Sequence, residues 1–199
     1  MNNPILDPAR VSEIHGNLWR GNFPLNKDRE VDFAQLDSLI GSEKSGLIQI
    51  CLTDNTGEVD LLEVLERTYA CKFTRSAPPF LDPQWDPALM HAMPYQNRLL
   101  CWWPIEGGTT PDVTGPSAQS YDFEGLIDFI SRLNEMSAKK IYVHCLNGTD
   151  RTGAVAAAYA IRNMSMSLDT AIDWASRTAA HKMSQPYLDL VKAFSSGGH

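Results

Sequence analysis

Hydrophobic residues along the chain follow two patterns, one typical of buried strands and the other of amphipathic helices. Short apolar runs rich in β-branched residues predict buried strands. These runs cover residues 17–21, 46–52, 99–103 and 141–143. Apolar residues spaced three and four positions apart predict helices. The expected helices cover residues 31–40, 59–69, 123–133, 152–164, 168–178 and 185–194.

Capping residues mark where two of these helices begin. Ser167 and Ser184 each precede a helix, where a side-chain oxygen accepts a hydrogen bond from a free N–H of the first turn. Pro186 occupies the first turn of the last helix, where its missing N–H does no harm. Residues 73–94, rich in proline and aromatic residues, permit no assignment, and residues 107–115 predict a loop.

Strands that alternate with helices predict the α/β class, with a central, mostly parallel sheet flanked by helices on both faces. The length of 199 residues fits one domain, so we expect a single domain over residues 1–199 with an ordered core at 5–195. In such sheets ligands bind beyond the carboxyl ends of strands, where loops lead into helices. The loop after Val143 meets this description most closely.

Composition and charge narrow the classes of function. A net charge of −7 argues against nucleic-acid binding, which depends on Lys and Arg neutralising phosphates. The longest apolar run, residues 154–161, is far shorter than the roughly 20 residues of a membrane span, so no membrane span is expected. No signal peptide is visible, so we expect a cytoplasmic location. The four cysteines form no CxxC pair, so neither a metal site nor a disulfide framework is expected.

The chemistry is concentrated in residues 144–153, HCLNGTDRTG. Five residues separate Cys145 from Arg151, enough for the backbone to wrap around one tetrahedral dianion with its N–H groups inward. Because helix N-termini and cations favour a thiolate, Cys145 is expected to be a nucleophile aimed at phosphorus. Arg151 offers a planar fork to the phosphoryl oxygens. The expected phosphate-binding loop consists of Leu146, Asn147, Gly148, Thr149, Asp150 and Arg151.

Other residues of this segment have supporting roles. Gly148 lies at mid-loop, where the absence of a Cβ permits a tight curl. Thr152 places a hydroxyl near the sulfur, suited to easing the departure of the thiolate. His144 is expected to orient the loop rather than to act as a base. Asp150 either braces the loop by hydrogen bonding, which we favour, or positions water.

This segment resembles the HCxxGxxR[ST]G signature of protein-tyrosine and dual-specificity phosphatases. Residues 17–21, NLWRG, are similar to the entry strand of small dual-specificity enzymes. Residues 103–109, WPIEGGT, are similar to the acid-loop region of kinase-associated phosphatase and its relatives. The resemblance implies hydrolysis in two steps through a cysteinyl-phosphate on Cys145, with no metal and no cofactor.

The resemblance also implies a general acid, an Asp on a mobile loop upstream of the cysteine. Asp112 lies 33 residues before Cys145 and is the residue that we predict. Glu106 lies 39 residues before Cys145, directly after the Trp-Pro-Ile stretch, and is the alternative.

The expected substrates are phosphorylated proteins, phosphotyrosine above all, with phosphoserine and phosphothreonine as further targets. A phosphoinositide or inositol phosphatase is the main alternative, since an Asp before the Arg is similar to the loops of myotubularins and bacterial phosphoinositide phosphatases. Residues 146–149, however, contain no Lys or Arg to hold several phosphates. The net charge disfavours an RNA 5′-phosphatase. A phosphoprotein-binding pseudophosphatase is disfavoured because the cysteine, the arginine and candidate acids are all present.

Two further groups leave alternatives open. Cys51 is expected to be a buried core thiol, and the alternative is a reversible disulfide with Cys145. Several aromatic residues either line the mouth of the pocket or pack in the core. They are Trp85, Tyr95, Trp102 and Trp103.

Overall fold

The computed structural model describes residues 5–53, 59–70, 91–93, 97–105, 122–179 and 181–197. The short 3₁₀ helix η1 spans Pro8–Arg10. The strands are β1 (Ser12–His15), β2 (Leu18–Gly21), β3 (Leu47–Cys51), β4 (His91–Met93), β5 (Arg98–Trp102) and β6 (Lys140–His144). The α-helices are α1 (Phe33–Ile40), α2 (Val59–Thr68), α3 (Phe123–Met136), α4 (Asp150–Met164), α5 (Leu168–Ser176) and α6 (Gln185–Ser196).

The strands form one six-stranded sheet in the order β1-β2-β6-β3-β5-β4. The four central strands run parallel, and β1 and β4 pair antiparallel at the two edges. Gly21, His144, Cys51 and Trp102 lie side by side in the register of the central strands. The loops that leave the carboxyl ends of these strands therefore open on the same edge of the sheet.

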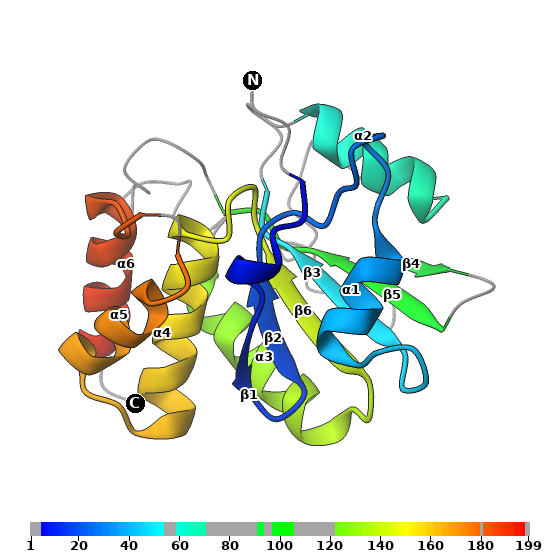
Figure 1. Cartoon of the computed structure of the whole chain (residues 1–199). Coiled ribbons are helices and arrows are strands. Elements are labelled where there is room, and N and C mark those ends of the chain that lie inside the picture. Colours follow the sequence, from blue (N-terminus) through cyan, green and yellow to red (C-terminus); the bar gives the residue numbers. More distant parts are fainter. Residues whose placement is uncertain are drawn as a thin grey trace.

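Helices cover both faces of the sheet, as the alternating pattern predicts. Figure 1 shows α4, α5 and α6 on one side and α1 and α2 on the other. All five residues of β3 are buried, and they divide between the two faces. Ile48 and Ile50 pack with α3 and α4, whereas Leu47 and Cys51 belong to clusters that contain side chains of α1 and α2. The predicted α/β class with a mostly parallel, doubly covered sheet is confirmed.

Two strands were not predicted from the sequence. β1, SEIH, buries only one of its four residues, Ile14, so it has no apolar run to reveal it. β4 lies within residues 73–94, the stretch that permitted no assignment. The helix expected at 152–164 begins two residues earlier, at Asp150. The loop expected at 107–115 lies outside the described residues.

Two tryptophans that follow one another in the chain pack in the core. Trp102 and Trp103 have exposed fractions of 6% and 5%. The indole N–H of Trp102 donates to the carbonyl of Thr53 at 2.8 Å, and Trp103 stacks on Phe129 with ring centroids 5.6 Å apart. Core packing is therefore confirmed for this pair, while Trp85 and Tyr95 lie outside the described residues.

Within the described ranges, no helix combines the length and the apolar character that crossing a bilayer requires.

Candidate active site

Cys145 directly follows β6, and α4 begins five residues later at Asp150. β6 lies between β2 and β3, so Cys145 emerges at the middle of the edge where the parallel strands end. The side chain of Cys145 is buried, with an exposed fraction of 4%. We call residues 145–151 the 145–151 loop.

Three successive carbonyls of the 145–151 loop are held from outside. The carbonyl of Leu146 accepts from the N–H of Phe23 at 3.1 Å, and that of Asn147 accepts from Arg10 at 3.2 Å. The carbonyl of Gly148 accepts from Arg20 at 2.8 Å. In a trans peptide the N–H of the next residue points the opposite way. The N–H groups of residues 147–149 therefore face the interior of the loop, where they can hold an anion.

Two glycines allow the loop to lie against β2. Gly148 has φ +70°, and a Cβ on it would stand 2.6 Å from the carbonyl carbon of Gly21. Gly21 in turn lies against the Tyr142 ring, because a Cβ on it would stand 2.2 Å from the phenolic oxygen. That hydroxyl donates to the carbonyl of Asn22 at 2.7 Å. No residue larger than glycine fits at either position without movement of its neighbours.

Arg151 and Thr152 lie in the first turn of α4, both buried. The Arg151 guanidinium donates to the carbonyl of Leu52, just beyond β3, at 3.3 Å. It therefore spans from α4 to the end of the neighbouring strand, beside the loop. The Thr152 hydroxyl makes no hydrogen bond to the described residues.

His144 is fully buried at the end of β6 and belongs to a chain of hydrogen bonds. Its Nε2 accepts from the side-chain amide of Gln49 at 2.7 Å, and the Gln49 oxygen accepts from the Tyr69 hydroxyl at 2.8 Å. Burial lowers the pKa of His144 to about 3, so the ring is neutral at neutral pH and its proton resides on Nδ1. The Nδ1–H makes no hydrogen bond to the described residues, and a neutral buried imidazole of this kind is a poor base.

The carboxylate of Asp150 points to the connection between α5 and α6. It accepts from the backbone N–H of Ser184 at 2.7 Å and from the Ser184 hydroxyl at 2.8 Å, and His181 lies 3.8 Å away. Ser184 occupies the expected N-cap position of α6, but its hydroxyl donates to Asp150 and makes no capping hydrogen bond to the helix. The cap expected at Ser167 is confirmed by its hydrogen bond from the N–H of Thr170.

Three of the cysteines are buried free thiols, namely Cys51, Cys101 and Cys145. The Cys51 sulfur lies 2.9 Å from the Thr53 hydroxyl and belongs to the cluster that packs against α2. Burial raises the pKa of Cys101 to about 12, so this thiol stays protonated at neutral pH. Cys51 is thus a core thiol in this structure.

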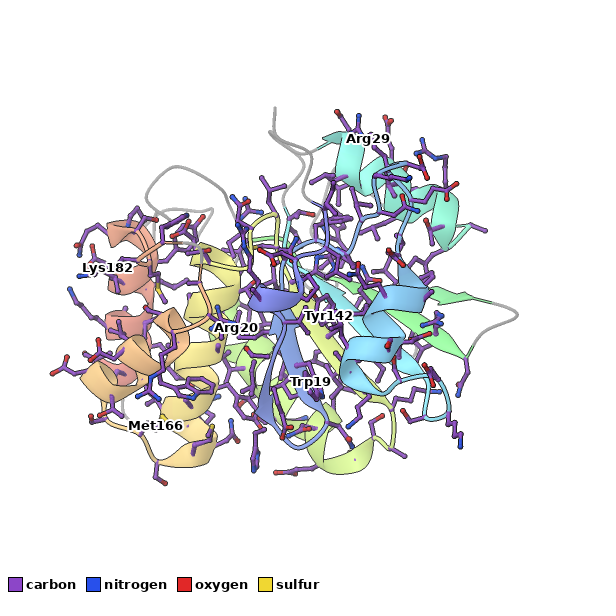
Figure 2. All side chains as sticks on the ribbon, viewed as in Figure 1. Trp19, Arg20, Arg29, Tyr142, Met166 and Lys182 are labelled. Carbon is purple, nitrogen blue, oxygen red and sulfur yellow. The ribbon has the colours of Figure 1, made fainter. Side chains whose placement is uncertain are left out.

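Arg20 is a residue of the site that the sequence reasoning did not single out. Its exposed fraction is 2%, and besides Gly148 it donates to the carbonyl of Ala175 in α5 at 2.6 Å. Burial lowers its pKa to about 10, so it keeps its proton at neutral pH. Figure 2 shows Arg20 on the side of the sheet where α4 and α5 lie, and Tyr142 on the other side. The available signal was a charged residue inside a buried strand, which requires partners.

The two candidates for the general acid, Asp112 and Glu106, lie outside the described residues. Among the residues that the structure describes, no group of three or more His, Cys, Asp and Glu side chains is placed to hold a metal ion.

Residues 88–189, more than half of the chain, match the family model of the dual specificity phosphatase catalytic domain. The chain therefore belongs to the dual-specificity phosphatase family, which confirms the family that the 144–153 segment resembles. A search of curated proteins found no match.

Solved structures with the same fold cover almost the whole chain. Tk-PTP in its active form has a TM-score of 0.56 at 16% identity, over 94% of this chain and 96% of its own. The catalytic domain of the PP-IP phosphatase SIW14 from S. cerevisiae has a TM-score of 0.51 at 17% identity, over 92% and 83%. Human tyrosine phosphatase-like serine/threonine/tyrosine-interacting protein has a TM-score of 0.52 at 14% identity, over 92% and 94%. At these identities the likeness concerns the fold.

Proposed function

We propose that residues 1–199 form one phosphatase domain that hydrolyses phosphate monoesters through a cysteinyl-phosphate on Cys145. Its substrates are phosphorylated proteins, phosphotyrosine above all, and phosphoserine and phosphothreonine as well. The observation that carries this proposal is the backbone of the 145–151 loop. Three of its carbonyls are held outward, so that three N–H groups face the space between Cys145 and the first turn of α4.

In the first step the thiolate of Cys145 attacks phosphorus, the S–P bond forms and the bond to the leaving oxygen breaks. That oxygen takes a proton from the general acid, Asp112, with Glu106 as the alternative. The inward N–H groups and the guanidinium of Arg151 bind the three non-bridging oxygens, whose charge is greatest in the transition state. The buried position of Cys145 keeps most water away from the sulfur.

In the second step a water molecule attacks the phosphorus of the cysteinyl-phosphate. The carboxylate of the residue that served as general acid, Asp112 or Glu106, takes the proton of this water. Inorganic phosphate leaves, and the sulfur returns to the thiolate. The Thr152 hydroxyl donates a hydrogen bond to the departing sulfur, a role open to it because it has no other partner among the described residues. No step uses a metal ion or a cofactor, so activity is expected to persist in excess EDTA.

Replacement of the nucleophile is the first test. Cys145→Ser should abolish turnover of an aryl phosphate and leave the fold intact, whereas Cys101→Ala, a change at another buried cysteine, should retain activity. Arg151→Lys keeps the charge but loses the fork, so both kcat and the affinity for substrate should fall. Turnover by Cys145→Ser at the wild-type rate would refute the proposal.

The general acid is identified with leaving groups of different basicity. Removal of the acid should slow the hydrolysis of phenyl phosphate far more than that of an activated aryl phosphate. The phenolate released from phenyl phosphate is a poor leaving group and needs a full proton, whereas the activated phenolate does not. We expect this selective loss in Asp112→Asn. If Glu106→Gln shows it instead, the role passes to Glu106.

A phosphoinositide or inositol phosphate is the second candidate substrate. Asp150 directly precedes Arg151, and SIW14, a PP-IP phosphatase by name, has the same fold. Initial rates on a phosphotyrosine peptide, a phosphothreonine peptide, phosphoinositides and 5′-triphosphorylated RNA separate these classes. Absence of turnover on every member, with phosphopeptide binding retained, would instead indicate a phosphoprotein-binding pseudophosphatase.

A further inference from the structure

We propose that Arg20 is a positioning residue of the active site, which fixes the Gly148–Thr149 peptide. The proposal rests on the proposed function, because it assigns the residue that holds the phosphate-binding backbone in place from behind.

The hydrogen bonds of Arg20 connect the loop to a distant helix. One terminal nitrogen donates to the carbonyl of Gly148 at 2.8 Å and the other to the carbonyl of Ala175 at 2.6 Å. Gly148 is buried, so its carbonyl would lack a partner without this contact. The same contact turns the N–H of Thr149 toward the phosphoryl position.

The shape of a guanidinium suits this bridge better than that of an ammonium group. Its two terminal nitrogens diverge in one plane and reach two carbonyls on different elements, whereas lysine presents a single point of charge.

No carboxylate among the described residues forms an ion pair with Arg20, so its charge is not cancelled locally.

Two ionisable groups near Arg20 carry no charge at neutral pH. Burial raises the pKa of Tyr142 above its usual range, so this phenol is neutral, and His144 is neutral as well. Arg151 on α4 supplies a second cation, present in every variant considered below. The acidic side chains of α5, Asp169 and Asp173, are exposed.

The variants Arg20→Gln and Arg20→Lys test this positioning role. Gln keeps a donor but removes the charge, and Lys keeps the charge but removes the fork. Arg162→Met is the control, because Arg162 is another arginine with two partners, but it lies on α4 and pairs with Asp128 and Glu124, away from the loop. The affinity for vanadate is measured by its protection of Cys145 against alkylation by iodoacetamide at one pH.

We expect Arg20→Lys to weaken vanadate binding about tenfold, as loss of an orienting contact predicts, and Arg20→Gln at least as much. Arg162→Met should leave the affinity for vanadate unchanged. A purely structural Arg20 would lower the unfolding midpoint without changing the affinity for vanadate.

Wild-type vanadate affinity in Arg20→Lys overturns the positioning role. If Arg20→Gln does not fold, Arg20→Lys still decides, because retained folding with unchanged vanadate affinity contradicts the proposal. Alkylation of Cys145 requires no turnover of substrate. A wild-type protein without phosphatase activity would therefore count against the proposed function, while the role of Arg20 could still be tested.

Discussion

Gly148 lies against the backbone of Gly21, and a Cβ on Gly148 would meet the Gly21 carbonyl carbon at 2.6 Å and the Asn22 nitrogen at 2.7 Å. The contact seats the 145–151 loop on the end of β2. Together with the hydrogen bond from Arg20 of the same strand, it makes β2 the backing of the loop. The position of the loop is therefore set by a segment more than a hundred residues away in sequence.

The first prediction concerns this contact. Gly148→Ala should cost about 2–4 kcal/mol in the free energy of unfolding, because a left-handed backbone and a steric clash with main-chain atoms add together. Phosphatase activity should fall at least a hundredfold, since the loop must move to admit the methyl group. Urea unfolding and steady-state kinetics provide the two measurements.

Gly41→Ala is the matched control for the backbone effect. Gly41 has nearly the same φ, +71°, at the end of α1, but a Cβ there would have no neighbour within 4 Å. It should cost about 1–2 kcal/mol and leave kcat/KM unchanged. Equal effects of the two substitutions on stability and activity would show that the close approach to Gly21 is unimportant.

The second prediction concerns Asp150, whose carboxylate holds Ser184 through two hydrogen bonds. Asp150→Ala should destabilise the fold by about 1–2 kcal/mol, and Ser184→Ala by less, because the backbone N–H of Ser184 remains as a donor. The double variant should be less destabilised than the sum of the two, as measured by a double-mutant cycle. If Asp150→Asn instead lowers kcat a hundredfold with unchanged stability, the carboxylate takes part in the chemistry.

The third prediction is a loss of stability in acid caused by His144. The unfolded chain binds a proton near the ordinary histidine pKa of about 6.5, whereas the folded protein does not until about 3. Between these values the unfolded state binds more protons, so stability should fall as the pH falls, by up to about 1.4 kcal/mol per pH unit from this residue.

The His144 contribution is isolated by urea unfolding at pH 7, 5 and 4. His144→Gln should be less stable than the wild type at pH 7, and this difference should shrink as the pH falls. His15→Gln, a change at an exposed histidine on β1, should leave the wild-type slope unaltered. A His144→Gln variant with the wild-type slope would refute the buried neutral histidine.

The fourth prediction is selective alkylation. Burial holds the pKa of Cys101 at about 12 and Cys51 is fully buried, so neither should react with iodoacetamide in the native protein at pH 7. Peptide mapping by mass spectrometry should find the label on Cys145 and not on these two. Labelling of Cys101 before Cys145 would contradict this assignment.

Most helices and strands of the fold can be predicted from the sequence, because each is encoded by a pattern of neighbouring residues. The helix α3 repeats its apolar residues at helical spacing, and β3 is an apolar run in which all five residues are buried. By contrast β1 buries one residue of four, so its place at the sheet edge comes from pairing with β2 and not from its own sequence.

The sequence alone determined the α/β class, the family and the order of chemical groups from His144 to Thr152, because periodicity and short-range spacing are properties of neighbouring residues. Only the tertiary structure decided what surrounds them. The Ser184 hydroxyl could form a hydrogen bond either with the first turn of α6 or with Asp150. It donates to Asp150 because folding brings α4 and the α5–α6 connection together. The partners of Arg20 are decided in the same way, because the carbonyls of Gly148 and Ala175 reach it only after the parallel strands and the covering helices have packed. A buried charge requires hydrogen-bond partners, and here the packing of distant segments supplies them.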